Sequence, residues 1–438
     1  MYKEISKELL SFLQKSPTAF HAVDNLKKEL MSNGYEELLE GQNWHIVPGG
    51  KYFVMRNYSS IIALNLGKDL DQYNFQVAAS HSDYPTFKIK ENAEIEVKGK
   101  YTQLNTEGYG GMLCATWFDR PLSVAGRVLV KEGNELHTKL INVDRDLLLI
   151  PNMAIHMNRA VNDGFAYNKQ VDMLPLFGDA DTKAEDFKKL IAQEAGVHVA
   201  DIYGSDLYLY NRTAPSIWGS HEEFISSQHL DDLQCGFTSL KGFLKGYNDK
   251  SINVFACFDN EEVGSQSKQG AGSTFLYDTL YRVNLALGKT VEDYYRALAS
   301  SFMLSADNAH AVHPNHPEKT DVKNCVYMNE GVVVKSHAGQ KYTSDAVSIA
   351  VLKTLCERAQ VPLQFFANRS DEAGGSTLGN IAMAQVSMNA VDIGLPQLAM
   401  HSTYETAGIK DTYYMIQLME QFFNSHISEV NDSVLRVD

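Results

Sequence analysis

The chain has 438 residues, of which 44% are hydrophobic and 21% are charged, an ordinary composition for a globular protein. At about 150 residues per domain, this length predicts two or three domains. The formal net charge of −15 argues against nucleic acid and anionic membranes as partners.

The first predicted elements are two helices, over residues 3–15 and 18–33, the second ending at Gly34. The start of the chain lacks a signal-peptide pattern, and no apolar stretch reaches the roughly 20 residues of a membrane span. A hairpin over 51–67 and a short apolar strand over 75–80 follow the helices.

The pattern changes between residues 90 and 224, where polar and apolar residues alternate and one helix is predicted at about 184–195. Helices and strands alternate again beyond this stretch: helices over 231–246, 291–304, 343–358 and 410–424, and strands over 252–258, 362–367 and 390–393. The order predicts an α/β domain formed by 1–89 and 225–438, interrupted by an inserted β-rich domain over 90–224.

The five cysteines are odd in number and widely spaced: Cys114, Cys235, Cys257, Cys325 and Cys356. No two of them form a CxxC pair. We therefore expect free thiols in a reducing, cytoplasmic environment and not a disulfide framework or a catalytic cysteine.

Several catalytic signatures are incomplete. HEEFI at 221–225 lacks the second histidine of H-E-x-x-H, and the glycine-rich stretch 264–273 lacks the ending of a phosphate-binding loop. GGSTLG at 374–379 is interpreted as the start of a helix, and no G-x-S-x-G elbow is present. Nucleophilic and nucleotide-dependent enzymes are weak candidates.

Carboxylates and histidines instead follow or precede apolar segments at five places: HSD (81–83), LDD (230–232), NEE (260–262), SAD (305–307) and MHS (400–402). Sites in open α/β sheets form outside the carboxyl ends of the strands, so these groups are candidates for one site. Imidazole and carboxylate donors suit zinc. Taken singly, each has a structural explanation; Asp231 and Asp232, for example, could be favourable charges at a helix N-terminus.

The adjacent pair Glu261 and Glu262 is the hardest to explain structurally, because neighbouring carboxylates repel. Adjacent side chains of an extended backbone point to opposite faces, so one carboxylate can bind a metal while the other handles a proton. A nearby dication relieves the repulsion. We interpret Glu262 as a metal ligand and Glu261 as a general base.

Three histidines in DNAHAVHPNHP (307–317), His310, His313 and His316, could suggest a separate metal tract. Pro314 and Pro317 interrupt a continuous helix, so the spacing does not place three imidazoles on one face. Roles near the metals or the substrate are better explanations for His310 and His313, and solvated loop histidines are the alternative.

The motifs AASHSDYP, YGGMLCATWFDRPLSVAGRV, PNMAIHMNR, HLDDL, FDNEEVGSQSKQGAGS, SADNAHAVHPNHPEK and LPQLAMHS resemble, in the same order, those of the aspartyl aminopeptidases, the family that includes vacuolar aminopeptidase I. The resemblance extends over nearly the whole chain and suggests a bacterial member. HSDYP and HLDDL depart from the family's commoner HTDSP and RLDNL, which puts fine specificity in doubt.

The resemblance implies an α/β/α, phosphorylase/hydrolase-like zinc-peptidase domain with an inserted β-rich dimerisation domain. It also implies two zinc ions per subunit, held by His81, Asp231, Glu262, Asp307 and His401. In this scheme His81 and Asp307 complete one metal site, Glu262 and His401 complete the other, and Asp231 bridges them.

Other residues match the family by motif. Asp83 would orient His81 through a hydrogen bond. Four positions match substrate-pocket residues of the family: His156, His310, Lys335 and Tyr342. His156 corresponds to a histidine that reaches a neighbouring subunit's active site, and Lys335 is a candidate cation for an acidic substrate, although a surface lysine is the alternative.

The expected function is removal of N-terminal residues, chiefly Asp or Glu, from short peptides, by a metal-activated water with Glu261 as general base. The resemblance also suggests self-association into a dimer-based tetrahedral dodecamer. Three alternatives stay open: an aminopeptidase of neutral or broad specificity, a two-metal deacylase, and a non-catalytic scaffold.

Overall fold

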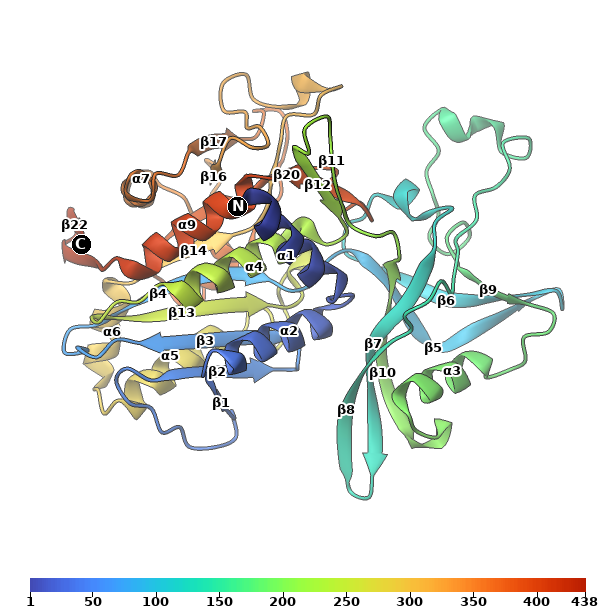
Figure 1. Ribbon diagram of the computed structural model, residues 1–438, viewed down its shortest axis with the longest axis horizontal. Coiled ribbons are helices and arrows are strands. Elements are labelled where there is room, and N and C mark those ends of the chain that lie inside the picture. The colour runs from blue at the N-terminus through green and yellow to red at the C-terminus, as the bar shows by residue number, and fades with distance from the viewer.

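A nine-stranded sheet forms the centre of the computed structural model, which describes residues 1–438 (Figure 1). In spatial order its strands are β1 (Glu36–Leu38), β2 (Lys51–Arg56), β3 (Ser60–Leu66), β13 (Ser251–Phe258), β4 (Asn74–His81), β14 (Phe302–Ala306), β18 (Asn389–Gly394), β16 (Val332–Ser336) and β17 (Leu363–Ala367). The middle strands β13, β4, β14 and β18 run parallel to one another. Every residue of β4, β13 and β14 is buried, as expected for parallel strands covered on both faces.

Helices cover both faces of this sheet. One apolar core joins the sheet to α2 (Ala19–Ser32), α4 (Leu230–Lys245), α7 (Ala346–Ala359) and α9 (Asp411–Asn424). A second core, on the other face, joins it to α5 (Phe275–Ala286), α6 (Val291–Ala299) and α8 (Leu378–Met383). The result is a three-layered α/β/α arrangement.

A separate six-stranded antiparallel sheet lies to the right of the central sheet in Figure 1. Its strands are, in order, β8 (Glu135–Asn142), β7 (Leu122–Glu132), β10 (Ile202–Asn211), β5 (Thr86–Val97), β6 (Tyr101–Tyr109) and β9 (Leu176–Asp179). It has its own apolar core, to which α3 (Asp186–Ala195) contributes Phe187 and Ile191. The chain therefore builds a second packing unit between two halves of the first.

A five-stranded sheet is formed by β11 (Ser216–Trp218), β12 (Phe224–Ser227), β20 (Glu405–Gly408), β19 (Pro396–Leu398) and β15 (Ala309–His310). The N-terminal helix α1 (Tyr2–Gln14) packs against this sheet and against α4 and α9. A small hairpin of β21 (Ile427–Asn431) and β22 (Val434–Val437) closes the chain.

Most predicted elements are confirmed within a few residues, including the two N-terminal helices, the hairpin at 51–67 and the helix after GGST. The helix predicted over 291–304 is wrong at its end. It stops at Ala299, and the fully buried residues Phe302–Ala306 form β14 between β4 and β18. A short apolar run is compatible with both a buried helical turn and a buried strand. Here the hydrogen-bonded pairing with β4 and β18 makes the run a strand.

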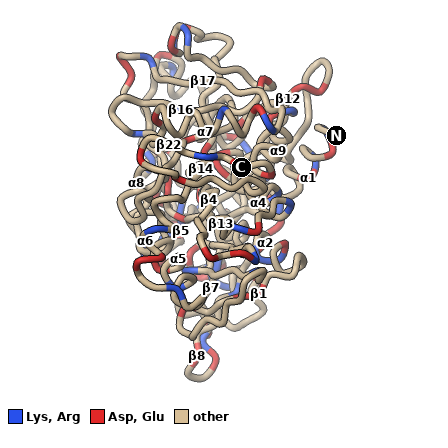
Figure 2. The backbone as a smooth tube through the Cα atoms, turned by 90° about the vertical axis from the view of Figure 1, so that its left-hand side faces the viewer, with Lys and Arg blue, Asp and Glu red and all other residues tan.

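Acidic and basic positions are interspersed along the backbone, so the negative charge is spread over the molecule (Figure 2). No helix combines the length and apolarity needed to cross a bilayer.

Candidate metal centre

Two predicted ligands, and the strand that leads to a third, end at one edge of the central sheet. His81 is the last residue of β4 and lies opposite Phe258, the last residue of β13. Asp307 directly follows β14, which is also parallel to β4. Since parallel strands end at the same edge, the residues that follow them share one site.

The other predicted ligands reach this edge from loops. Asp231 lies at the start of α4, where it and Asp232 depart from helical geometry and are joined by a cis peptide bond. Glu262 belongs to a 3₁₀ turn over Glu261–Val263, and His401 follows β19.

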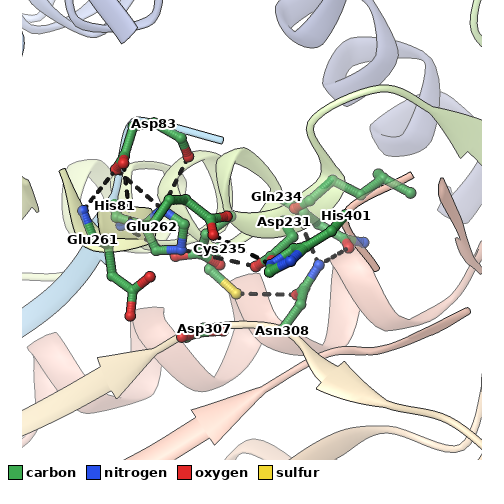
Figure 3. A network of polar contacts seen from close by, with 12 residues as sticks. His81, Asp83, Asp231, Gln234, Cys235, Glu261, Glu262, Asp307, Asn308 and His401 are labelled. Carbon is green, nitrogen blue, oxygen red and sulfur yellow. Dashed lines mark hydrogen bonds and ion pairs between the residues drawn. The ribbon is translucent and has the colours of Figure 1, made fainter. Parts of the chain in front are cut away.

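The donor atoms of these residues lie close together (Figure 3). Asp231 faces a histidine with each of its carboxylate oxygens: Oδ1 lies 3.8 Å from Nε2 of His81 and Oδ2 lies 3.2 Å from Nε2 of His401. The same His401 nitrogen lies 3.3 Å from Oε2 of Glu262. Asp231 is thus the shared member of two donor groups.

These donors fit a divalent cation. His81, Asp231 and Glu262 offer atoms within 4.8 Å of one another, and so do Asp231, Asp232 and Asp307. Three carboxylate oxygens, one each from Asp231, Asp232 and Glu262, are buried without a hydrogen-bond partner. Buried carboxylates without partners are costly unless a cation or a proton satisfies them.

Burial raises the pKa of several carboxyl groups of this cluster. At Asp231, burial acts in the same direction, but His401 and His81 outweigh it and lower the pKa. Burial raises the pKa of Glu262, and the carboxylate of Asp231 raises it further. Burial also raises the pKa of Asp307 against the opposing effect of Lys335, and it raises that of Glu261 to about 8. Without metal, the cluster therefore binds protons unusually well.

Asp83 holds the loop that carries the two glutamates. Its Oδ1 accepts a 3.1 Å hydrogen bond from the backbone N–H of Glu261, and its Oδ2 accepts one of 3.2 Å from that of Glu262. The ring nitrogen Nδ1 of His81 lies 3.0 Å from the backbone oxygen of Asp83 and 3.5 Å from its carboxylate. Asp83 therefore contacts both the histidine and the glutamate loop.

The expectation of an extended backbone at Glu261 and Glu262 is wrong. Both residues lie in a 3₁₀ turn, which has about three residues per turn, so their side chains diverge by roughly a third of a turn instead of a half. The divergence still separates them. Glu262 faces His401, while the carboxylate of Glu261 points away from that group (Figure 3).

Of the four predicted substrate-pocket residues, Lys335 is the most deeply integrated into the site. Lys335 is buried, only 2% exposed, and its ammonium donates to the backbone oxygens of Asp307 at 2.8 Å and Asn308 at 3.3 Å. It also lies 3.5 Å from the Asp307 carboxylate and 5.3 Å from the ring centre of Tyr342. A surface lysine, the alternative reading, is excluded.

His310 lies on the wall of a groove of about 390 Å³, which also includes Phe366, Arg369 and Met400, the residue before His401. His156, by contrast, lies in the exposed stretch 151–157. The structure brings His310, Lys335 and Tyr342 to the site and leaves His156 free of it.

Three further residues support this site and are absent from the predicted set. Asp232, the neighbour of the predicted ligand Asp231, accepts a hydrogen bond at its Oδ2 from the backbone N–H of His81 at 3.1 Å. Glu405 is buried and accepts bonds from the backbone N–H groups of Asp231 at 3.0 Å and His401 at 2.8 Å. Tyr109 donates its hydroxyl to Asp83 at 2.6 Å. Each carried a positional signal: Asp232 stands in LDD, Tyr109 opens the motif YGGMLCATWF, and Glu405 lies four residues after His401.

The α/β/α fold and its cluster of histidine and carboxylate donors are those of a metal-dependent hydrolase. The family profile described as "Aminopeptidase I zinc metalloprotease (M18)" matches residues 12–423. The chain belongs to this family of zinc aminopeptidases, which confirms the resemblance seen in its motifs.

Relatives support the assignment over almost the whole chain. A "Probable M18 family aminopeptidase 2" of Clostridium acetobutylicum is 47% identical over 427 residues, covering 96% of this chain and 99% of the relative. In the cryo-EM structure of the Ape4 and Nbr1 complex, one chain superposes with a TM-score of 0.93 at 36% identity, covering 97% of this chain and 86% of that one. A subunit of the S. cerevisiae mApe1 dodecamer superposes with a TM-score of 0.85 at 26% identity, covering 96% and 97%.

Proposed function

We propose that this protein is a two-zinc aminopeptidase that removes acidic N-terminal residues from short peptides. The observation that carries the proposal is the position of Asp231, whose two carboxylate oxygens face two different histidines. A carboxylate in this position can bridge two cations, one on each side.

Of the residues present, His81 and Asp307 would hold one zinc ion, Glu262 and His401 would hold the other, and Asp231 would contribute to both. The buried, unpartnered oxygens of Asp231 and Glu262 support this assignment. Asp232 lies within the same acidic group, and its Oδ1 is also unpartnered. Because its Oδ2 binds the backbone N–H of His81, we assign it to holding the ligands in place.

Zinc bound here would supply Lewis-acid chemistry: polarisation of the peptide carbonyl and activation of a water molecule for attack. Glu261 is the proposed general base that takes the proton of this water and passes it to the leaving amine. Its carboxylate lies outside the two donor groups, and burial raises its pKa to about 8 in the metal-free protein. Zinc ions nearby would favour the ionised form, which is the form that accepts a proton. Asp83 fixes the Glu261 backbone and so limits where the carboxylate can lie.

Lys335 is the proposed determinant of acidic specificity. Two of its three N–H groups are directed at the carbonyls of Asp307 and Asn308, which anchor the ammonium beside a metal ligand. A carboxylate side chain of the substrate would be attracted to this fixed charge. Tyr342 and His310 would line the pocket, and the groove beside His310 and Met400 would take the following residues of the peptide.

We also propose that the inserted domain mediates self-association. The mApe1 relative forms a dodecamer, and the stretch around His156 exposes three apolar side chains in this chain: Met153, Ile155 and Met157. Exposed apolar side chains in one short segment are typical of an interaction surface. His156 would then enter the site of a neighbouring subunit, and the mass in solution would exceed that of a monomer.

The five unpaired cysteines support a cytoplasmic location.

The deciding experiment is release of the N-terminal residue from matched short peptides that begin with Asp, Glu, Leu or Lys. It is run on the purified protein, on the metal-free protein and after zinc is restored. Zinc-dependent release that favours Asp and Glu supports the whole proposal. Zinc-dependent release that favours Leu or Lys retains the two-metal reaction but contradicts the role of Lys335. Absence of release from zinc-loaded protein contradicts the proposed reaction.

A further inference from the structure

We propose that Tyr109, a residue of the six-stranded sheet, is a positioning residue for the metal centre of its own chain. The inference rests on the proposed roles of Glu261 and Glu262. It gives the inserted sheet a function within the subunit, in addition to any role in association.

The Tyr109 hydroxyl lies at the centre of a short hydrogen-bond chain. It donates to Oδ2 of Asp83 at 2.6 Å and accepts from the side-chain amide of Asn260 at 2.8 Å. Asn260 directly precedes Glu261, and Asp83 accepts the backbone N–H groups of both glutamates. One hydroxyl therefore binds two residues that together fix the start of the glutamate turn.

The pairing of the first two strands of the insert explains how Tyr109 reaches this place. Only a few residues separate His81, at the end of β4, from Thr86, at the start of β5. Thr86 pairs with Tyr109, the last residue of β6. The end of β6 is consequently held beside the metal-site edge of the central sheet.

The residues after Tyr109 continue along the same site. Gly110 adopts a left-handed φ of +73°, and a Cβ there would lie 3.2 Å from Cβ of Glu262, so the chain packs directly on this proposed ligand. Leu113 donates its backbone N–H to the carbonyl of His401 at 3.1 Å. The segment 109–113 thus contacts the glutamate loop and the His401 loop, which come from distant parts of the sequence.

Loss of the hydroxyl would leave Asp83 and Asn260 each without one partner in a largely buried site. Partners that orient metal ligands typically account for about 10- to 100-fold in metal affinity or activity. Tyr109 contacts neither metal donors nor the groove, so its removal should change kcat and zinc affinity and leave KM nearly unchanged.

The test compares Tyr109→Phe with Tyr208→Phe in the full-length protein. Tyr208, on β10, packs its ring edge-to-face on Tyr109 with centroids 5.9 Å apart, but its hydroxyl makes no hydrogen bond with Asp83 or Asn260. Each variant loses one hydroxyl from the same aromatic pair. The measurements are zinc affinity by chelator competition, kcat and KM on the preferred peptide, and the unfolding temperature.

We expect Tyr109→Phe to lower kcat or zinc affinity by about 10-fold or more relative to Tyr208→Phe, with KM within about twofold and similar unfolding temperatures. Asn260→Gly keeps the left-handed backbone, removes the amide donor and should act in the same direction. Equal kcat and equal zinc affinity in the two tyrosine variants would overturn the proposal. If the wild-type protein releases no N-terminal residue, the proposed reaction fails, and zinc affinity alone still decides the role of Tyr109.

Discussion

His401 Nε2 lies 3.2 Å from Oδ2 of Asp231, although Asp231 stands at the start of α4 and His401 lies in the loop between β19 and β20, far away in the chain. This contact puts Asp231 between two histidines, because its other oxygen faces His81. The arrangement makes different ligand substitutions distinguishable by the amount of zinc that each variant retains.

Asp231→Ala should lose zinc from both sites, because the variant lacks the carboxylate that both share. His401→Ala should lose zinc from one site only. Metal content measured after dialysis against limiting zinc separates the two outcomes, with Asp432→Asn in the exposed C-terminal hairpin as the control. Equal retention of zinc by Asp231→Ala and Asp432→Asn would refute the bridging role.

The neighbouring glutamates should behave in opposite ways. Glu261→Gln should keep its zinc and lose about 10²- to 10⁴-fold in kcat, since a general base typically contributes this much. Glu262→Gln should lose zinc, because its carboxylate belongs to a donor group. Paired measurements of zinc content and kcat check both expectations. A Glu261→Gln enzyme with near-normal turnover would remove Glu261 from the mechanism.

Lys335→Ala should reduce the preference for Asp over Leu at the peptide N-terminus. A hydrogen bond to a charged group contributes about 1.5–3 kcal/mol, which corresponds to a loss of roughly 10- to 100-fold in selectivity. The measurement is the ratio of kcat/KM values for the two peptides. Lys353→Ala, which removes an exposed lysine of α7, is the control. Unchanged selectivity in zinc-loaded Lys335→Ala would contradict the assignment.

The stability of the metal-free protein should fall as pH rises. Burial raises the pKa of Glu261 and Glu405 to about 8 and also raises that of Asp307. A carboxyl group whose pKa is higher in the folded state binds protons better there than in the unfolded state, so its contribution is complete in acid and is lost on the way to about pH 8.

Zinc replaces these protons and stabilises the folded state in proportion to its affinity, which rises as the ligands deprotonate. The difference in unfolding temperature between zinc-loaded and metal-free protein should therefore widen between about pH 5 and pH 8. Calorimetry of both forms across this range is the test. A difference that stays constant or narrows would show that the acidic cluster does not hold the metal.

Sequence patterns identified most of the central architecture. Period-2 alternation and buried apolar runs located the strands that deliver His81 and the glutamate pair, because these patterns follow directly from burial on one or both faces. The patterns failed at the boundary between α6 and β14, because a five-residue apolar run shows no periodicity. Pairing with β4 and β18 determines that this run is a strand.

The order of residues alone shows which side chains are available for chemistry. The five proposed ligands and the base all stand at the ends of apolar segments, and their motifs identify the family. Tertiary structure decided which atoms face one another. It placed Lys335 beside Asp307 and brought Tyr109 to Asp83. It also placed Glu405 where its carboxylate accepts the backbone N–H groups of Asp231 and His401. These contacts join residues far apart in the chain, and local periodicity carries information only about neighbours along one strand or helix.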